Sequence, residues 1–232
     1  MTGQISRRRA LVGMLIAVAG VPFARQISAA RAVAVHVPEA VVDQTHTAAK
    51  TDTAVFAGGC FWGIQAVFQH VKGVTTATSG YSGGWTNKPS YEDVSSGRTG
   101  HAESVRVVFD PAQVSYGTLL RVFFSVAHDP TELNRQGPDV GTQYRSALFY
   151  TSDEQKHVAD AYIDQLNKAH TFPRPIVTEV KAFKTFFPAE AYHQNYATLH
   201  PDQPYIAIND APKVDNLKRE FPELWSEKLS AY

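Results

Sequence analysis

The chain has 232 residues, of which 44% are hydrophobic, with 22 basic and 22 acidic side chains. These values are typical of a soluble globular domain with extensions rather than a disordered or integral membrane protein. Residues 1–31 hold five arginines and no acid, so subtracting five from 22 leaves 17 basic against 22 acidic residues in the rest. This acidic remainder argues against nucleic acid or an anionic membrane surface as a partner.

Residues 1–32 have the three parts of an export signal. Three arginines, Arg7 to Arg9, precede an apolar run over about residues 10–21, and small residues follow in SAARAVA. The run is too short for a stable membrane anchor. The arginine cluster resembles a twin-arginine signal, which directs export and does not anchor the protein. We therefore expect export to the periplasm without a stable membrane anchor. Residues 33–52 are small, polar and without periodicity, and are expected to form a linker.

From Thr53 onward, patterns typical of strands alternate with patterns typical of helices. Strands are expected over residues 53–57, 74–81, 101–109, 144–151 and 176–183, and helices over 60–71, 116–128, 153–170, 188–200 and 214–225. This order predicts an α+β fold with a mixed, largely antiparallel sheet flanked by helices, in the manner of a ferredoxin-like plait. Residues 53–232 are expected to form one domain.

The single cysteine, Cys60, lies in the motif GGCFWG. A strand that ends in two glycines and leads into a helix places Cys60 at the helix N-terminus, where free N–H groups favour an anion. This setting predicts a lowered thiol pKa and a reactive thiolate, whereas the alternative is a small buried side chain. The neighbouring Phe61 and Trp62 are either core aromatics or an apolar seat for a methyl group or thioether.

Four polar residues in turn-rich segments are further candidates. Glu103 begins a strand after a glycine turn, so it is either a solvated glutamate or a shielded acid with a raised pKa. Asp139 and Tyr144 lie in GPDVGTQYRS, and Tyr91 lies in NKPSYEDV. Loop tyrosines of this kind serve either as packing lids or as hydrogen-bond donors in a site.

Five motifs together resemble the peptide methionine sulfoxide reductases of the A type: GGCFWG, GYSGG, PSYEDVSSGRTGHAE, HDPTELNRQGPDVGTQYRS and AEAYHQNY, within residues 53–196. The resemblance implies an α+β plait and the reduction of methionine S-sulfoxide, protein-bound or free. It implies that Cys60 attacks the sulfoxide sulfur and that Glu103 protonates the sulfoxide oxygen. Such chemistry needs a thiolate opposite an acid across an apolar, water-poor pocket.

The same resemblance assigns the remaining candidates. It implies that Tyr91 and Tyr144 hydrogen-bond the sulfoxide oxygen, with Asp139 supporting this polar network. It also implies that Phe61 and Trp62 hold the methyl group of the substrate. No bound cofactor and no metal are expected, because no His, Cys or Asp cluster has ligand spacing.

The sequence departs from the family pattern in three places. Gln65 stands where a glutamate is common, Ser95 stands where some relatives have an extra cysteine, and residues 200–232 lack recycling cysteines. A Cys60 sulfenic acid would therefore have no internal partner and would need an external thiol, from a thioredoxin-fold protein or a small molecule. We expect a monomer that repairs oxidised exported proteins.

Three other classes of protein are alternatives to this interpretation. A Cys–His hydrolase would need His101, His128 or His193 beside Cys60. A module that binds oxidised methionine without turnover would not need an acid such as Glu103. A thioredoxin-like oxidoreductase is disfavoured because CFWG has no second cysteine.

Overall fold

The computed structural model describes Met1, residues 34–44 and residues 50–232. The strands are β1 (Asp52–Gly58), β2 (Val74–Ser82), β3 (Ala102–Phe109), β4 (Arg135–Gln136), β5 (Asp139–Val140), β6 (Ser146–Tyr150), β7 (Glu179–Ala182) and β8 (Phe186–Pro188). The α-helices are α1 (Phe61–Gln69), α2 (Tyr91–Ser95), α3 (Tyr116–Val122), α4 (Asp153–Lys168), α5 (Tyr196–Leu199) and α6 (Ala211–Glu220). The export signal expected over residues 1–32 lies outside the described residues, apart from Met1.

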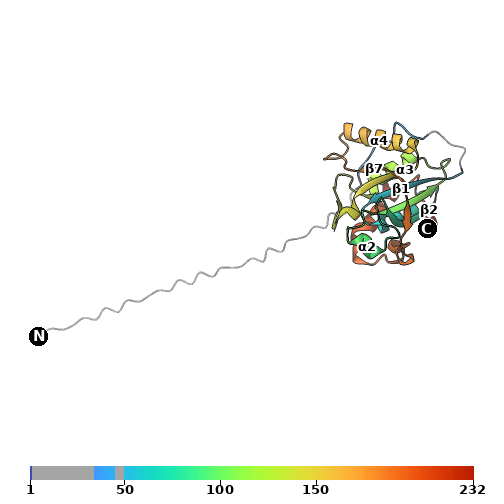
Figure 1. The fold of residues 1–232 in the computed structure, drawn as a ribbon. Coiled ribbons are helices and arrows are strands. Elements are labelled where there is room, and N and C mark those ends of the chain that lie inside the picture. Colours follow the sequence, from blue (N-terminus) through green and yellow to red (C-terminus); the bar gives the residue numbers. More distant parts are fainter. Residues whose placement is uncertain (2–33, 45–49) are drawn as a thin grey trace.

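The main sheet has six strands in the order β7-β6-β1-β3-β2-β8. The β6–β7 pair runs parallel, and the other pairs run antiparallel. Figure 1 shows α4 beside β7 at one end of the molecule and α2 at the other. The expected α+β fold, a mixed and largely antiparallel sheet with flanking helices, is confirmed. The ferredoxin-like plait stays a prediction.

Helix α1 lies inside the molecule and carries Cys60 at its N-terminal end. Every residue of α1 except Trp62 is buried, because the helix packs between the sheet and the C-terminal helix α6. A helix that is apolar on nearly all sides is stable only when covered in this way. Strand β1, which leads into it, is buried from Ala54 to Gly58. The two buried elements hold Cys60 in a fixed position.

Two expected helices differ from the structure in ways that concern the site. The helix after Ser115, whose side chain caps it, continues as a π-helical turn at Phe123–Ala127. The helix expected over residues 188–200 is divided into a short 3₁₀ turn, Ala191–His193, and α5. Between them Asn195 has a left-handed backbone with φ of 57°, which ends the helical path.

Residues 34–44, which belong to the expected linker, pack on the domain. Val37 is 1% exposed, and the backbone N–H of Val35 donates to the carbonyl oxygen of Ser125 at 3.0 Å. The carboxylate of Asp43 accepts hydrogen bonds from the Ser115 hydroxyl and the Gly117 N–H at the start of α3. This part of the chain therefore packs on α3 and the π-helical turn, whereas a linker would make few contacts with the domain.

The C-terminal residues are fastened to the far end of α1 and to β2. The N–H of Ser226 donates to the carbonyl of His70 at 2.7 Å, and the His70 ring stacks on Trp225 at 4.1 Å. The N–H of Ala77 donates to Ala231 at 2.9 Å, so the C-terminus lies beside β2 (Figure 1). In the described part of the chain, no helix combines the length and the apolar character needed to cross a bilayer.

Candidate active site

A cavity of about 210 Å³ brings together all seven residues that the sequence singles out. It is lined by Cys60, Phe61, Trp62, Tyr91, Glu103, Asp139, Tyr144, Gln203 and Tyr205. They come from the start of α1, from β3 and β5, from the start of α2 and from the turn before β6. Segments that are far apart in the chain thus place a thiol, carboxyl groups and phenols around one small space.

Cys60 occupies the N-cap position of α1, as its motif predicts. Gly59 before it has φ of +95°, a conformation that glycine adopts without strain. A Cβ atom at Gly59 would lie 2.6 Å from Gln136, and one at Gly58 would lie 2.9 Å from His128. The two glycines therefore let the backbone of the turn pass close to these side chains, which explains why they precede the cysteine.

The predicted lowering of the Cys60 pKa is wrong. The thiol is 8% exposed, and its burial raises its pKa well above the usual range. The carboxyl groups of Asp210 and Glu103 raise the pKa further, while the N–H of Trp62 and the ammonium of Lys213 lower it. Desolvation outweighs the helix terminus here because the N-cap lies inside the protein. The thiol at rest is therefore protonated.

Alkylation of Cys60 by iodoacetamide should follow this raised pKa. Because the thiolate is the reacting form, we expect the rate to rise about tenfold per pH unit from pH 7 to pH 9 without levelling off. The measurement is intact mass against time at each pH, with denatured protein as the control for an unperturbed thiol. A rate that levels off below pH 8 would contradict the raised pKa and support the lowered Cys60 pKa that the motif predicts.

Glu103 is a buried acid that keeps its proton at neutral pH. It is 2% exposed on β3, and burial raises the pKa of its carboxyl to about 8. The backbone N–H of Phe61 donates to its Oε2 at 3.1 Å and acts in the opposite direction, and the carboxyls of Asp139 and Asp210 add to the rise. Glu103 lines the same small cavity as Cys60, so it can donate a proton to a group bound there.

Two of the three tyrosines that line the cavity, Tyr91 and Tyr144, are hydrogen-bond donors to a bound group. Burial and the nearby Glu103 raise the pKa of the Tyr91 and Tyr144 hydroxyls, so both keep their protons. Tyr91 is the first residue of α2, where Ser90 caps the helix and the Tyr91 N–H donates to Glu190 at 2.9 Å. Tyr144 ends the 3₁₀ turn Thr142–Tyr144. Their hydroxyls suit an acceptor oxygen in the cavity.

The two aromatic residues after Cys60 have different environments. Phe61 is fully buried, with the rings of Tyr81 and His193 at 5.9 and 5.1 Å, so it belongs to the core behind the cavity. Trp62 is half-buried and stacks on Tyr196 at 3.9 Å, and its Nε1–H donates to His193 Nδ1 at 3.1 Å. The indole is thus held as a fixed apolar wall of the cavity.

The sequence pattern of the family described as peptide methionine sulfoxide reductase matches residues 52–225. The chain belongs to this family. It is 62% identical over 178 residues to peptide methionine sulfoxide reductase MsrA 2 of Mesorhizobium japonicum, which covers 77% of this chain and 91% of that protein. It is 52% identical over 198 residues to the protein of the same name from Synechocystis sp., covering 84% and 91%.

Solved structures agree with the sequence comparison. The chain is similar to reduced Mxr1 from Saccharomyces cerevisiae, with a TM-score of 0.60 and 33% identity over 68% of this chain and 91% of that one. It is also similar to methionine sulfoxide reductase A of Corynebacterium diphtheriae, with a TM-score of 0.57 and 32% identity over 73% and 89%. The reductase is therefore an oxidoreductase that reduces methionine sulfoxide.

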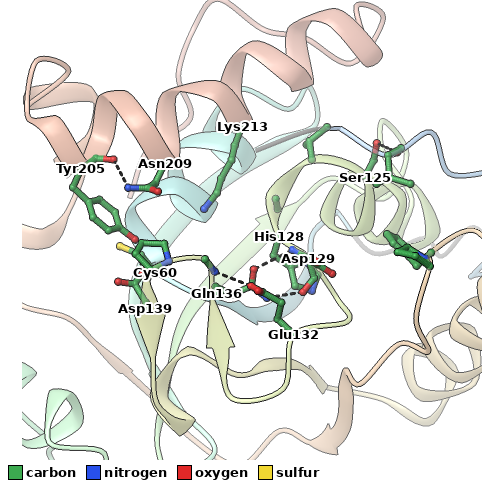
Figure 2. A pocket seen from close by; sticks show the side chains of 17 residues that line it. Cys60, Ser125, His128, Asp129, Glu132, Gln136, Asp139, Tyr205, Asn209 and Lys213 are labelled. Atoms are coloured by element: carbon green, nitrogen blue, oxygen red, sulfur yellow. Dashed lines mark hydrogen bonds between the residues drawn. The ribbon is translucent and has the colours of Figure 1, made fainter. Parts of the chain in front are cut away.

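Tyr205 is a member of the reductase site that the sequence did not reveal. Its hydroxyl donates to the carboxylate of Asp139, and both side chains lie beside Cys60 in Figure 2. Burial raises the pKa of Asp139, and this hydrogen bond and Lys213 oppose the rise. The segment PYIAIND, which holds Tyr205, contains no motif of the family resemblance. Its one local signal is an aromatic residue directly after a proline.

Asp210 and Lys213 were also missed, and they set the charge near the reductase thiol. Asp210 is fully buried, and its Oδ1 accepts a hydrogen bond from Lys213 Nζ at 3.1 Å. It lies against the first turn of α1, where a Cβ at Gly63 would come within 2.1 Å of Oδ1. These residues are about 150 positions from Cys60 in sequence, so local patterns carry no sign of the contact.

Gln65, one of the departures from the family pattern, joins α1 to two other segments of the reductase. It is 1% exposed, its Nε2 donates to Ala77 and Gln194 at 2.8 and 2.9 Å, and its Oε1 accepts from the Asn195 N–H. An amide supplies both the donors and the acceptor that these partners need. Its effect on the site is therefore structural.

The histidines of the described residues do not form a hydrolase dyad with Cys60. His128 bonds to Ser146 and Phe123, and burial lowers its pKa to about 3. His101 bonds to Gly84 and Thr86, and His193 bonds to Trp62. Within the ranges that the structure describes, no group of three or more His, Cys, Asp or Glu is placed to hold a metal ion.

Proposed function

We propose that this enzyme reduces the S epimer of methionine sulfoxide, free and in proteins, through a Cys60 sulfenic acid that an external thiol then reduces. The observation that carries the proposal is the pairing of Cys60 with Glu103 on one cavity of about 210 Å³. A sulfoxide oxygen leaves sulfur only when it is protonated, and Glu103 holds a proton at neutral pH.

The first half of the reaction can be written with this chain's own groups. Cys60 Sγ attacks the sulfoxide sulfur and loses its proton, while Glu103 gives its proton to the sulfoxide oxygen and then takes one back. Oxygen moves to Sγ, so the thiol is oxidised to a sulfenic acid and the sulfoxide is reduced to the thioether. Tyr91 and Tyr144 hydrogen-bond the oxygen, and Trp62 faces the methyl group. No net proton is needed, which suits a site whose thiol and acid are both neutral at rest.

The second half requires electrons from outside the chain. Cys60 is the single cysteine of the sequence, so its sulfenic acid has no internal thiol to attack it. An external thiol forms a mixed disulfide with Cys60, and a second thiol releases the enzyme. We propose a thioredoxin-fold protein or a small thiol as the donor. We also propose, from the basic and apolar pattern of residues 1–32, that the enzyme acts in the periplasm on oxidised exported proteins.

Stoichiometric oxidation without reductant tests this function. With one equivalent of methionine S-sulfoxide we expect about one methionine per chain, with a mass gain of one oxygen. The R epimer should give no burst, and Cys60→Ser should give none with either epimer. Equal bursts with both epimers would refute the stereochemical assignment. A disulfide-linked homodimer formed as fast as the burst would refute the external thiol.

A further inference from the structure

A second and larger cavity meets the substrate cavity at Cys60. Its volume is about 380 Å³, and it shares Cys60, Asp139 and Tyr205 with the smaller one. The remaining walls include Val126, His128, Asp129, Glu132, Gln136, Phe172, Asn209 and Lys213. Figure 2 labels all of these except Val126 and Phe172. Glu103, Tyr91 and Trp62 do not line it.

The two cavities meet at Cys60 but have different neighbouring residues there. His128 and Gln136, which line the larger cavity, contact Gly58 and Gly59 just before the cysteine. Phe61 and Trp62, which follow the cysteine, line the smaller cavity. The hydrogen-bonded pair of Tyr205 and Asp139 lines both cavities and so stands at their boundary. Cys60 thus lines two cavities whose other walls are largely different.

The chemistry of the sulfenic acid gives the second space a use. A thiolate that displaces oxygen from a divalent sulfur attacks from the side opposite the S–O bond. The oxygen comes from the sulfoxide held near Glu103, so it lies on the side of the smaller cavity. The attacking thiolate must then arrive from a different direction, and the larger cavity, which Glu103 does not line, also reaches Cys60.

We propose that the larger cavity admits the thiol that reduces the Cys60 sulfenic acid, an inference that rests on the proposed function. The incoming thiolate forms an S–S bond with Cys60 Sγ, the S–O bond breaks, and the oxygen leaves as water with a proton from Glu103. A second thiol attacks the outer sulfur, which releases a disulfide and returns the Cys60 thiol. A low-molecular-weight thiol fits the volume, whereas a cysteine on a folded protein would have to enter on an extended segment.

Lys213 places one positive charge on the wall of this cavity, which Asp129, Glu132 and Asp139 also line. It is the one lysine or arginine among the described residues that line the space, and its side chain is 12% exposed. Its partner Asp210 is buried and does not line the cavity, so the ammonium lies between that carboxylate and the open space. His128 on the opposite wall is uncharged because burial lowers its pKa to about 3.

Two tryptophan substitutions that fill the cavity from different walls test the proposal. In Asn209→Trp and Pro173→Trp, Cys60 is oxidised with one equivalent of hydrogen peroxide, and its reduction by β-mercaptoethanol is followed by intact mass. We expect both rate constants to fall about tenfold, since access of the thiol limits the exchange. Ile208→Trp is the matched control, because Ile208 is 46% exposed beside Asn209 and lines neither cavity.

The outcomes separate this proposal from the proposed function. Reduction at the rate of the unmodified protein in both filled variants would overturn the cavity assignment. Equal slowing in Ile208→Trp would do the same, because the effect would then not depend on the cavity. Slowing with a thioredoxin but not with β-mercaptoethanol would overturn the assignment to a small thiol. A missing methionine burst in the unmodified protein would refute the proposed function, while the peroxide route would still test the cavity.

Discussion

Replacing Glu103 with glutamine is expected to slow the methionine burst about 100-fold at pH 7, since general acid catalysis typically contributes at least that much. Glutamine keeps an oxygen to accept the Phe61 N–H bond that holds Glu103 in place, but it has no proton to give. The loss should therefore lie in the rate of the burst and not in its final size of one methionine per chain. Rapid quenching with S-sulfoxide in excess measures the rate directly.

Glu92→Gln is the matched control for this experiment. Glu92 is an exposed carboxylate on α2, next to Tyr91, and it lines neither cavity. Its substitution makes the same change of side chain near the site without touching the buried acid, so the burst should keep its rate. A change of less than about threefold in Glu103→Gln would mean that another group protonates the oxygen.

The same substitution is expected to stabilise the fold at neutral pH. Glu103 has an ordinary pKa of 4.5 when unfolded and a pKa of about 8 in the folded protein. Between these values the unfolded chain releases a proton that the folded chain keeps, so the free energy of unfolding decreases by about 1.4 kcal/mol per pH unit. Glutamine avoids this loss, and the gain should reach about 3 kcal/mol at pH 7.

Urea unfolding at several pH values measures this effect. The difference between Glu103→Gln and the unmodified protein should be near zero below pH 4.5, grow with pH, and level off above pH 8. A difference that stays constant with pH would mean that the substitution acts through packing. A difference that grows with pH as expected would show that Glu103 costs stability in return for its proton, as functional sites often do.

Much of the site and the fold could be predicted because their signals are local. The glycines before Cys60 act within one turn of the chain, so the motif placed Cys60 at a helix N-cap. The strand and helix order followed from short periodic runs. The motifs also singled out Glu103 and Tyr144, which the structure brings to the same cavity.

The features that could not be predicted depend on contacts between distant segments. The thiol pKa was mispredicted because the helix terminus is local, while the burial that outweighs it comes from the whole fold. The Tyr205–Asp139 bond joins residues 66 positions apart. The left-handed Asn195, whose N–H is held by Gln65 from 130 positions away, divides a segment that otherwise has a helical pattern.

The fastening of the C-terminal residues limits how the enzyme could be redesigned to form its own disulfide. Trp225 and Ser226 are held at the His70 end of α1, while Cys60 caps the opposite end. A helix of nine residues is about 14 Å long, and a disulfide needs Cα atoms within about 7 Å of each other. A cysteine exchanged into this tail would thus sit at the wrong end of the helix. An internal thiol would instead have to come from a segment beside Cys60, such as the one that holds Gln203 and Tyr205.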